Sequence, residues 1–223
     1  MKLYPLEPTS KLSSEIEKTS RRLKLDVIIK KPFDIGALVV IGDGALDGKA
    51  LAILAYHLNG DRGVALAKPK ETRLGAVDKL PSYLGLKFRK IAILIDQEEE
   101  GVDNITSQVE DRLRRMGVDL NVEDADRRFK LYRCVRGGKD FKLALAINGL
   151  DNIAAKKHSI EDHFVMAAKA CMPDIKISEL EGAKESWEKL NEKDQLKVFE
   201  DLRHNGDVKR IFPQQVKALR ALF

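Results

Sequence analysis

Two apolar runs of strand length in this sequence end in acidic residues. The first run covers residues 37–41 (Ala-Leu-Val-Val-Ile) and the second covers residues 91–95 (Ile-Ala-Ile-Leu-Ile). Ligands of open α/β sheets bind beyond the carboxyl ends of the parallel strands, so adjacent strands would open both acidic turns onto one edge. The carboxylates that follow the two runs are Asp43, Asp47, Asp96 and Glu98.

Carboxylates in this arrangement suit a divalent-metal site. Mg²⁺ needs only one or two protein carboxylates, because waters and substrate phosphate oxygens complete its coordination. A metal held in this way can neutralise a phosphodiester and activate a nucleophile. A further carboxylate nearby can serve as general acid or base.

The same spacing also fits a purely structural role. Acids after strands cap the following helix and favour its positive N-terminal end. Asp43 or Asp47 would cap a helix that starts near Leu46, and residues 98–100 (Glu-Glu-Glu) would do the same for the helix after Gly101. Spacing alone leaves the metal site and the helix caps as alternatives.

The pattern of the chain predicts an α/β fold with a mainly parallel sheet. Continuous apolar runs are typical of strands that are buried on both faces of a parallel sheet. Strands at 37–41, 63–67 and 91–95 alternate with helices at 46–58, 72–84 and 102–116, as in right-handed βαβ units. A helix is also expected over 12–23 and a short strand over 25–29.

The second half of the sequence follows a different pattern. Residues 129–135 and 140–147 predict a hairpin around Gly137-Gly138. From Ile160 onward the expected elements are helices, at 160–171, 178–190, 193–204 and 213–222. We therefore expect three parts: an N-terminal helix and strand (1–36), a main domain (37–174) and a C-terminal helical appendage (175–223).

Several acidic segments resemble the motifs of the Toprim fold. Residues 43–47 (Asp-Gly-Ala-Leu-Asp) are similar to the acid-Gly-x-x-Asp segment of that family, and residues 96–98 (Asp-Gln-Glu) are similar to its Asp-x-Asp segment. Residues 148–151 (Asn-Gly-Leu-Asp) and 159–163 (Ser-Ile-Glu-Asp-His) resemble the later loop and helix start of Toprim-like proteins related to overcoming-lysogenization-defect nucleases. The match covers residues 37–170.

The resemblance implies a four-stranded, mainly parallel sheet between helices and metal-dependent phosphoryl transfer on nucleic acid, as in primases, topoisomerases and nicking nucleases. It implies Mg²⁺ or Mn²⁺ as the cofactor, with Asp96 and Glu98 as ligands. Asp43 would be a ligand or the general acid/base, and Asp47 a second catalytic, supporting carboxylate.

A second pair of acids, Glu161 and Asp162, would complete this acidic edge. The pair also fits an ordinary helix start, in which Ser159 or Asp162 is the cap. His158 and His163 are five residues apart, which is not the i, i+4 spacing of a metal-binding pair, so exposed or capping histidines are expected there.

The chain departs from the Toprim pattern at two positions. The family's first acid is normally Glu, and here it is Asp43; the second acid of the Asp-x-Asp pair is Glu98. Both changes keep the charge, but a displaced acid/base group costs much of the rate. A catalytically degenerate module that binds nucleic acid or a protein partner is therefore the alternative hypothesis.

Charge and composition permit a nucleic-acid partner without requiring one. The net charge is +5, with 40 basic and 35 acidic residues. A basic stretch with interleaved aromatics falls on the predicted hairpin, where it would contact a phosphate backbone or form a solvated face. Its candidate nucleic-acid-binding residues are Arg128, Lys130 and Arg133.

Compartment and membrane context follow from residue usage. Cys134 and Cys171 make neither a disulfide framework nor a zinc site, which favours a reducing cytoplasm. No segment approaches the roughly 20 apolar residues of a membrane span, so no membrane association is expected.

Overall fold

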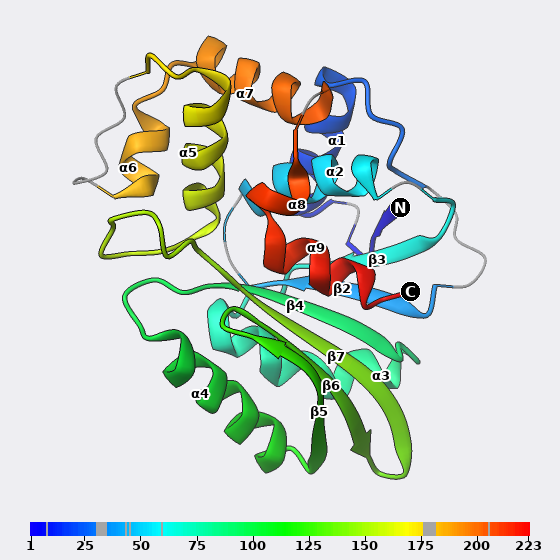
Figure 1. Ribbon diagram of the computed structural model, residues 1–223. Coiled ribbons are helices and arrows are strands. Elements are labelled where there is room, and N and C mark those ends of the chain that lie inside the picture. Colours follow the sequence, from blue (N-terminus) through cyan, green and yellow to red (C-terminus); the bar gives the residue numbers. More distant parts are fainter. Residues whose placement is uncertain are drawn as a thin grey trace.

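A computed structural model describes residues 1–7, 9–29, 35–42, 44, 46–58, 60–175, 182–204 and 206–223. The protein is an α/β fold in which a mostly parallel sheet lies between helices (Figure 1). The strands are β1 (Lys2–Pro5), β2 (Ala37–Ile41), β3 (Gly63–Ala67), β4 (Lys90–Asp96), β5 (Val118–Asp126), β6 (Phe129–Arg136) and β7 (Lys139–Asn148). The helices are α1 (Lys11–Arg22), α2 (Leu46–His57), the 3₁₀ helix η1 (Arg73–Lys79), α3 (Leu80–Gly85), α4 (Val102–Arg115), α5 (Ile160–Cys171), α6 (Ala183–Glu188), α7 (Glu192–His204), α8 (Val208–Ile211) and α9 (Pro213–Arg220).

The sheet has the strand order β1-β3-β2-β4-β7-β6-β5 among the described residues. The five strands from β1 to β7 in this order are parallel, and β6 and β5 continue the sheet in antiparallel fashion. The sheet is thus wider than the four strands that the Toprim resemblance implies. The expected hairpin around Gly137-Gly138 is confirmed and supplies β6 and β7.

Helices cover both faces of the sheet. Successive strand residues point to opposite faces, so each apolar run contributes side chains to two hydrophobic cores, one on each face of the sheet. Residues 38, 40, 91, 93 and 95 pack with η1, α3 and α4, and residues 39, 41, 92 and 94 pack with α1, α2, α5 and the C-terminal helices. Burial on both faces explains why β2 and β4 are continuous apolar runs.

The C-terminal helices pack directly on the main sheet. Helix α9 contacts β7, β6 and β4, and its Val216 and Leu219 belong to the same apolar core as Leu51 of α2. In Figure 1 the red helix α9 lies across the sheet, with α7 beside α1 and α2. The predicted helix 160–171 is confirmed; the first part of the predicted helix 178–190 lies outside the described residues, and α6 accounts for residues 183–188.

Three segments differ from the expectations. Residues 25–29 were expected to form a strand, but the structure has only an isolated bridge there, between Ile28 and Leu3. The first strand is instead β1, which pairs with β3. Strand β5 was not expected, although its first six residues, Val-Asp-Leu-Asn-Val-Glu, alternate between apolar and polar side chains, which is a strand signal that was missed. Within the described residues, no helix combines the length and the apolar character needed to cross a membrane.

Candidate functional site at the carboxyl edge of the sheet

The parallel strands β2, β4 and β7 bring polar residues together at their carboxyl ends. Asp96 is the last residue of β4 and is in register with Asn148, the last residue of β7. Both positions continue the alternation of Ala92, Leu94 and Ala146, so both side chains face the layer that contains α2, α5 and α9. Asp43 follows β2 in the sequence and lies outside the described residues.

Asn148 links two of the predicted acids. Its Nδ2 atom donates to Asp96 Oδ1 at 2.8 Å and to Asp47 Oδ1 at 3.1 Å. Asp47 stands in the first turn of α2, and all three side chains are buried. Two carboxylates that are 49 residues apart in the sequence are thus joined through one amide group.

Asp96 also contacts a helix N-terminus, but not that of the helix that follows it. The backbone N–H of Ile160, at the start of α5, donates to Asp96 Oδ1 at 3.2 Å. Helix α4, the next in the chain, begins after Gly101, which makes no side-chain cap bond. The first N–H groups of a helix have no partner within the helix, so Asp96 satisfies one such group of α5.

Glu98 is held beside Asp96 by an unusual backbone conformation. Its φ of 57° lies in the left-handed region, which is uncommon for residues other than glycine. The N–H of Glu98 donates to the His158 carbonyl at 2.8 Å, and the N–H of His158 donates to the Glu98 carbonyl at 3.0 Å. Strained backbone of this kind gathers at functional sites and costs on the order of 1–3 kcal/mol.

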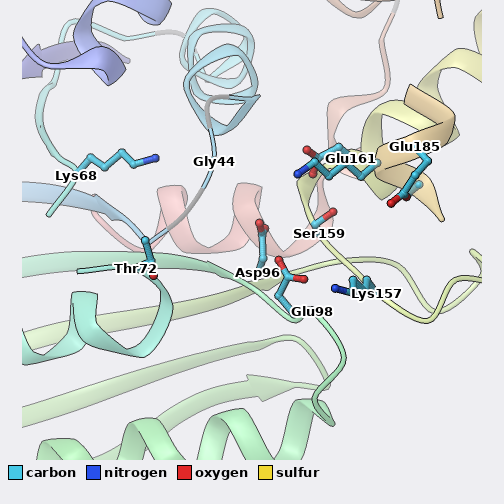
Figure 2. Close-up of a pocket in the computed structure, with 11 residues that line it drawn as sticks. Gly44, Lys68, Thr72, Asp96, Glu98, Lys157, Ser159, Glu161 and Glu185 are labelled. Atoms are coloured by element: carbon cyan, nitrogen blue, oxygen red, sulfur yellow. The ribbon is translucent and has the colours of Figure 1, made fainter. Parts of the chain in front are cut away.

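A cavity of about 400 Å³ opens at this edge. Asp96 and Glu98 both line it, and Figure 2 shows their carboxylates side by side, with the Lys68 side chain extending from the opposite wall. Further positive charge comes from Lys157 and Lys184. The lining thus carries both signs of charge, because Glu161 and Glu185 lie on it together with the lysines, and such a lining suits a metal ion together with a phosphate group.

The two acids at the start of α5 have different surroundings. Glu161 lines the cavity, and burial raises the pKa of its carboxyl group. Asp162 is fully buried and accepts from the Leu150 N–H at 2.8 Å and from His158 Nδ1 at 2.6 Å. Burial raises the pKa of Asp162, and the hydrogen bond from His158 opposes that shift. Asp162 thus fixes the loop between β7 and α5, while Glu161 faces the cavity.

His163 is fully buried, so the expectation of an exposed or capping histidine was wrong. Its ring stacks on Phe212 at 5.2 Å between centroids, and burial lowers its pKa to about 4. The ring is therefore neutral near pH 7. The spacing along the helix could have indicated this burial, because His163 shares a helix face with Ile160 and Ala167, which are both buried.

Two further polar residues of this region had not been predicted. Gln214 and Gln215 of α9 are both buried, and Gln215 Nε2 donates to Asn148 Oδ1 at 2.8 Å. Their partners lie between 51 and 67 residues away in the chain, and no local motif marks such contacts. For Asn148 a signal existed, because it is a polar residue in the alternation that ends β7.

The three basic residues proposed for nucleic acid do not converge on one surface. Arg128 is buried, and its Nη2 atom bonds Asp151 at 2.6 Å. Lys130 pairs with Glu110 of α4 at 3.1 Å. Arg133 is exposed and lies three residues further along β6, so its side chain points to the other face of the strand, where it pairs with Glu123.

On that face Arg133 and Lys142 both bond Glu123, at 2.9 and 3.0 Å. The hydrogen bond from Lys142 is the main cause of the lowered pKa of Glu123. Basic charge on this part of the hairpin is thus matched by an acidic neighbour.

The donor set at the carboxyl edge fits a hard divalent cation in part. Asp96 and Glu98 are two oxygen donors on one cavity, which is the number that Mg²⁺ takes from a protein when water and phosphate complete its shell. Within the described ranges no group of three or more His, Cys, Asp or Glu could hold a metal, and that statement does not extend to Asp43.

Comparison of the chain with protein-family models, curated proteins and solved structures gives no match.

Proposed function

We propose that this chain is a Toprim-like protein that holds Mg²⁺ or Mn²⁺ at the carboxyl edge of its sheet and acts on a phosphodiester, with nucleic acid as the substrate. The observation that supports this most is the pair Asp96 and Glu98 on one cavity, at the carboxyl end of the parallel strand β4. This is the position where open α/β sheets bind ligands.

In this proposal Asp96 and Glu98 hold the metal, and Asp43 is a further ligand or the general acid/base. Asp47 is the supporting carboxylate that shares Asn148 with Asp96. The metal would neutralise phosphate charge and lower the pKa of an attacking water.

The lysines that line the cavity would bind the substrate phosphate. Lys68 follows β3, Lys157 precedes α5 and Lys184 belongs to α6, so positive charge reaches the cavity from three elements. Lysine suits this role because its ammonium group acts as a compact point charge for phosphate.

A calorimetric Mn²⁺ titration tests the proposal. The wild type should bind, Asp96→Asn should not, and Asp119→Asn, a control on the exposed edge strand β5, should bind like the wild type. Hydrolysis of labelled oligonucleotides should then require the metal and be lost in Asp96→Asn. Full activity in Asp96→Asn would refute the assignment.

The second candidate is a Toprim-like module that binds nucleic acid or a protein partner without catalysis. It is favoured by the departures of Asp43 and Glu98 from the family pattern. It predicts salt-sensitive binding that a chelator leaves unchanged. An affinity for oligonucleotides that collapses in a chelator would argue against it.

A further inference from the structure

A chain of buried hydrogen bonds connects the C-terminal helices to the acidic edge. Its starting point is the backbone carbonyl of Ile211 in α8, which contacts His163 Nδ1. A carbonyl oxygen can only accept, so Nδ1 must carry the proton. The neutral ring then leaves Nε2 as an acceptor with one lone pair, which the Gly149 N–H at 3.3 Å shares with Gln215 Nε2 at 3.0 Å.

The acceptor on His163 determines the orientation of the Gln215 amide. Gln215 Nε2 lies 3.0 Å from His163 Nε2 and 2.8 Å from Asn148 Oδ1, so each of its two N–H groups has an acceptor. A flipped amide would put the Gln215 oxygen against two acceptors.

Gln214 does not compete for the same acceptor. Its Nε2 atom donates to the carbonyl oxygens of Ile147 and Gly149, at 3.2 and 3.0 Å, and these two bonds use both of its hydrogens. The contact of 3.1 Å between Gln214 Nε2 and His163 is therefore not a hydrogen bond. Gln215 alone connects α9 to Asn148 through its side chain.

The orientation of Gln215 determines that of Asn148 in turn. Because Asn148 Oδ1 accepts from Gln215, its Nδ2 group must face Asp47 and Asp96. Every side chain in this series is at most 5% exposed, so water does not compete for the bonds.

We infer that Gln215 is a positioning residue of the acidic site. Through Asn148 it fixes the carboxylates of Asp47 and Asp96, and it keeps Asn148 a hydrogen-bond donor. For metal binding the inference rests on the function proposed above. Groups that orient metal ligands typically contribute 10–100-fold to metal affinity.

A Mn²⁺ titration of Gln215→Met tests the inference for metal binding. The affinity should fall by up to about tenfold, the lower end of the range for a group that bonds a metal ligand directly, because Gln215 acts through Asn148. Val216→Ala is the matched control: it removes a buried apolar group from the same helix, so it should lower stability and leave the affinity unchanged. Equal affinities of Gln215→Met and the wild type would overturn the inference.

A second measurement tests the inference in the absence of a metal. Gln215 and Asp96 have no direct bond in this series, so a double-mutant cycle on urea unfolding with Gln215→Met and Asp96→Asn isolates coupling through Asn148. Non-additive effects support the inference, even if the wild type binds no Mn²⁺ and the proposed function fails. Additive effects overturn it. If Gln215→Met does not fold, Gln215→Asn replaces it in the cycle. Asparagine keeps the amide group but is too short to reach Asn148.

Discussion

The carboxyl edge of the sheet is acidic and buried, whereas the β5–β6 hairpin carries exposed charges of both signs. At the edge, Asp47 and Asp96 are oriented by an amide that is itself held from α9. On strand β6, Arg133 pairs with Glu123 of the adjacent strand β5, and more than half of the arginine side chain is exposed. Exposed pairs contribute little to stability, while buried polar groups are costly to disturb. The comparison teaches that charge density alone does not identify a site; burial and convergence do.

The largest effect on stability is expected from Asp162→Ala at the buried edge. The substitution leaves His158 and the Leu150 N–H without their acceptor, so the free energy of unfolding should fall by about 3–5 kcal/mol. Glu123→Ala on the hairpin should cost at most about 1 kcal/mol. Urea unfolding measures both, and equal losses would remove the contrast between the two regions.

Stability at acid pH should depend on His163. Because the folded pKa is about 4 and the ordinary value is 6.5, the unfolded chain takes up a proton first as the pH falls. The stability from this group is complete above pH 6.5 and is lost toward pH 4, by about 3 kcal/mol in total. Burial raises the pKa of Asp162, which shifts stability in the opposite direction, so the measurement is the difference between the wild type and His163→Gln across this range. A difference that does not change with pH would contradict the prediction.

A smaller effect is expected from Glu98→Gly. Glycine adopts the left-handed conformation freely, so the free energy of unfolding should rise by up to about 1 kcal/mol while Mn²⁺ binding is lost. Lys87→Gly is the matched control, because Lys87 has a φ of 68° on an exposed turn. It should give a similar gain in stability with unchanged Mn²⁺ binding. If Glu98→Gly keeps the metal, Glu98 is not a ligand.

The smallest effect is expected from Arg133→Ala on the hairpin. Loss of this exposed pair should change the free energy of unfolding by less than about 0.5 kcal/mol and leave Mn²⁺ binding intact. If this strand also contacts nucleic acid, the slope of log affinity against log salt should fall by about one. An unchanged slope would exclude Arg133 from a nucleic-acid surface.

The central sheet could be predicted because its strands are buried on both faces. β2 and β4 are continuous apolar runs, and the hairpin of β6 and β7 was marked by Gly137-Gly138. β5 has a different signal, the alternation of apolar and polar residues over 118–123, and that signal was missed. It is an edge strand that pairs with β6, and most of its side chains are exposed, so it does not form a continuous apolar run like β2 and β4.

The acidic residues of the candidate site could be predicted because they stand at or just after the end of a strand or in the first turn of a helix. Asp96 and Glu98 follow an apolar run, and the structure brings them to one cavity. Gln215 has no such signal, because its role depends on a contact 67 residues away in the chain. Within the later Toprim-like segment 148–151, Asp151 bonds Arg128, and Asn148 is the residue that reaches the acids.

The fixed direction of the hydrogen bonds from Ile211 to Asp96 has an evolutionary consequence. Positions 96, 148, 163 and 215 lie on four separate elements, yet reversing the donor or acceptor at one of them leaves its neighbour without a partner. Related sequences should therefore change these positions together, for example with a different residue at 163 wherever position 215 cannot donate. Such paired substitutions would identify the hydrogen-bonded residues of the site from sequences alone.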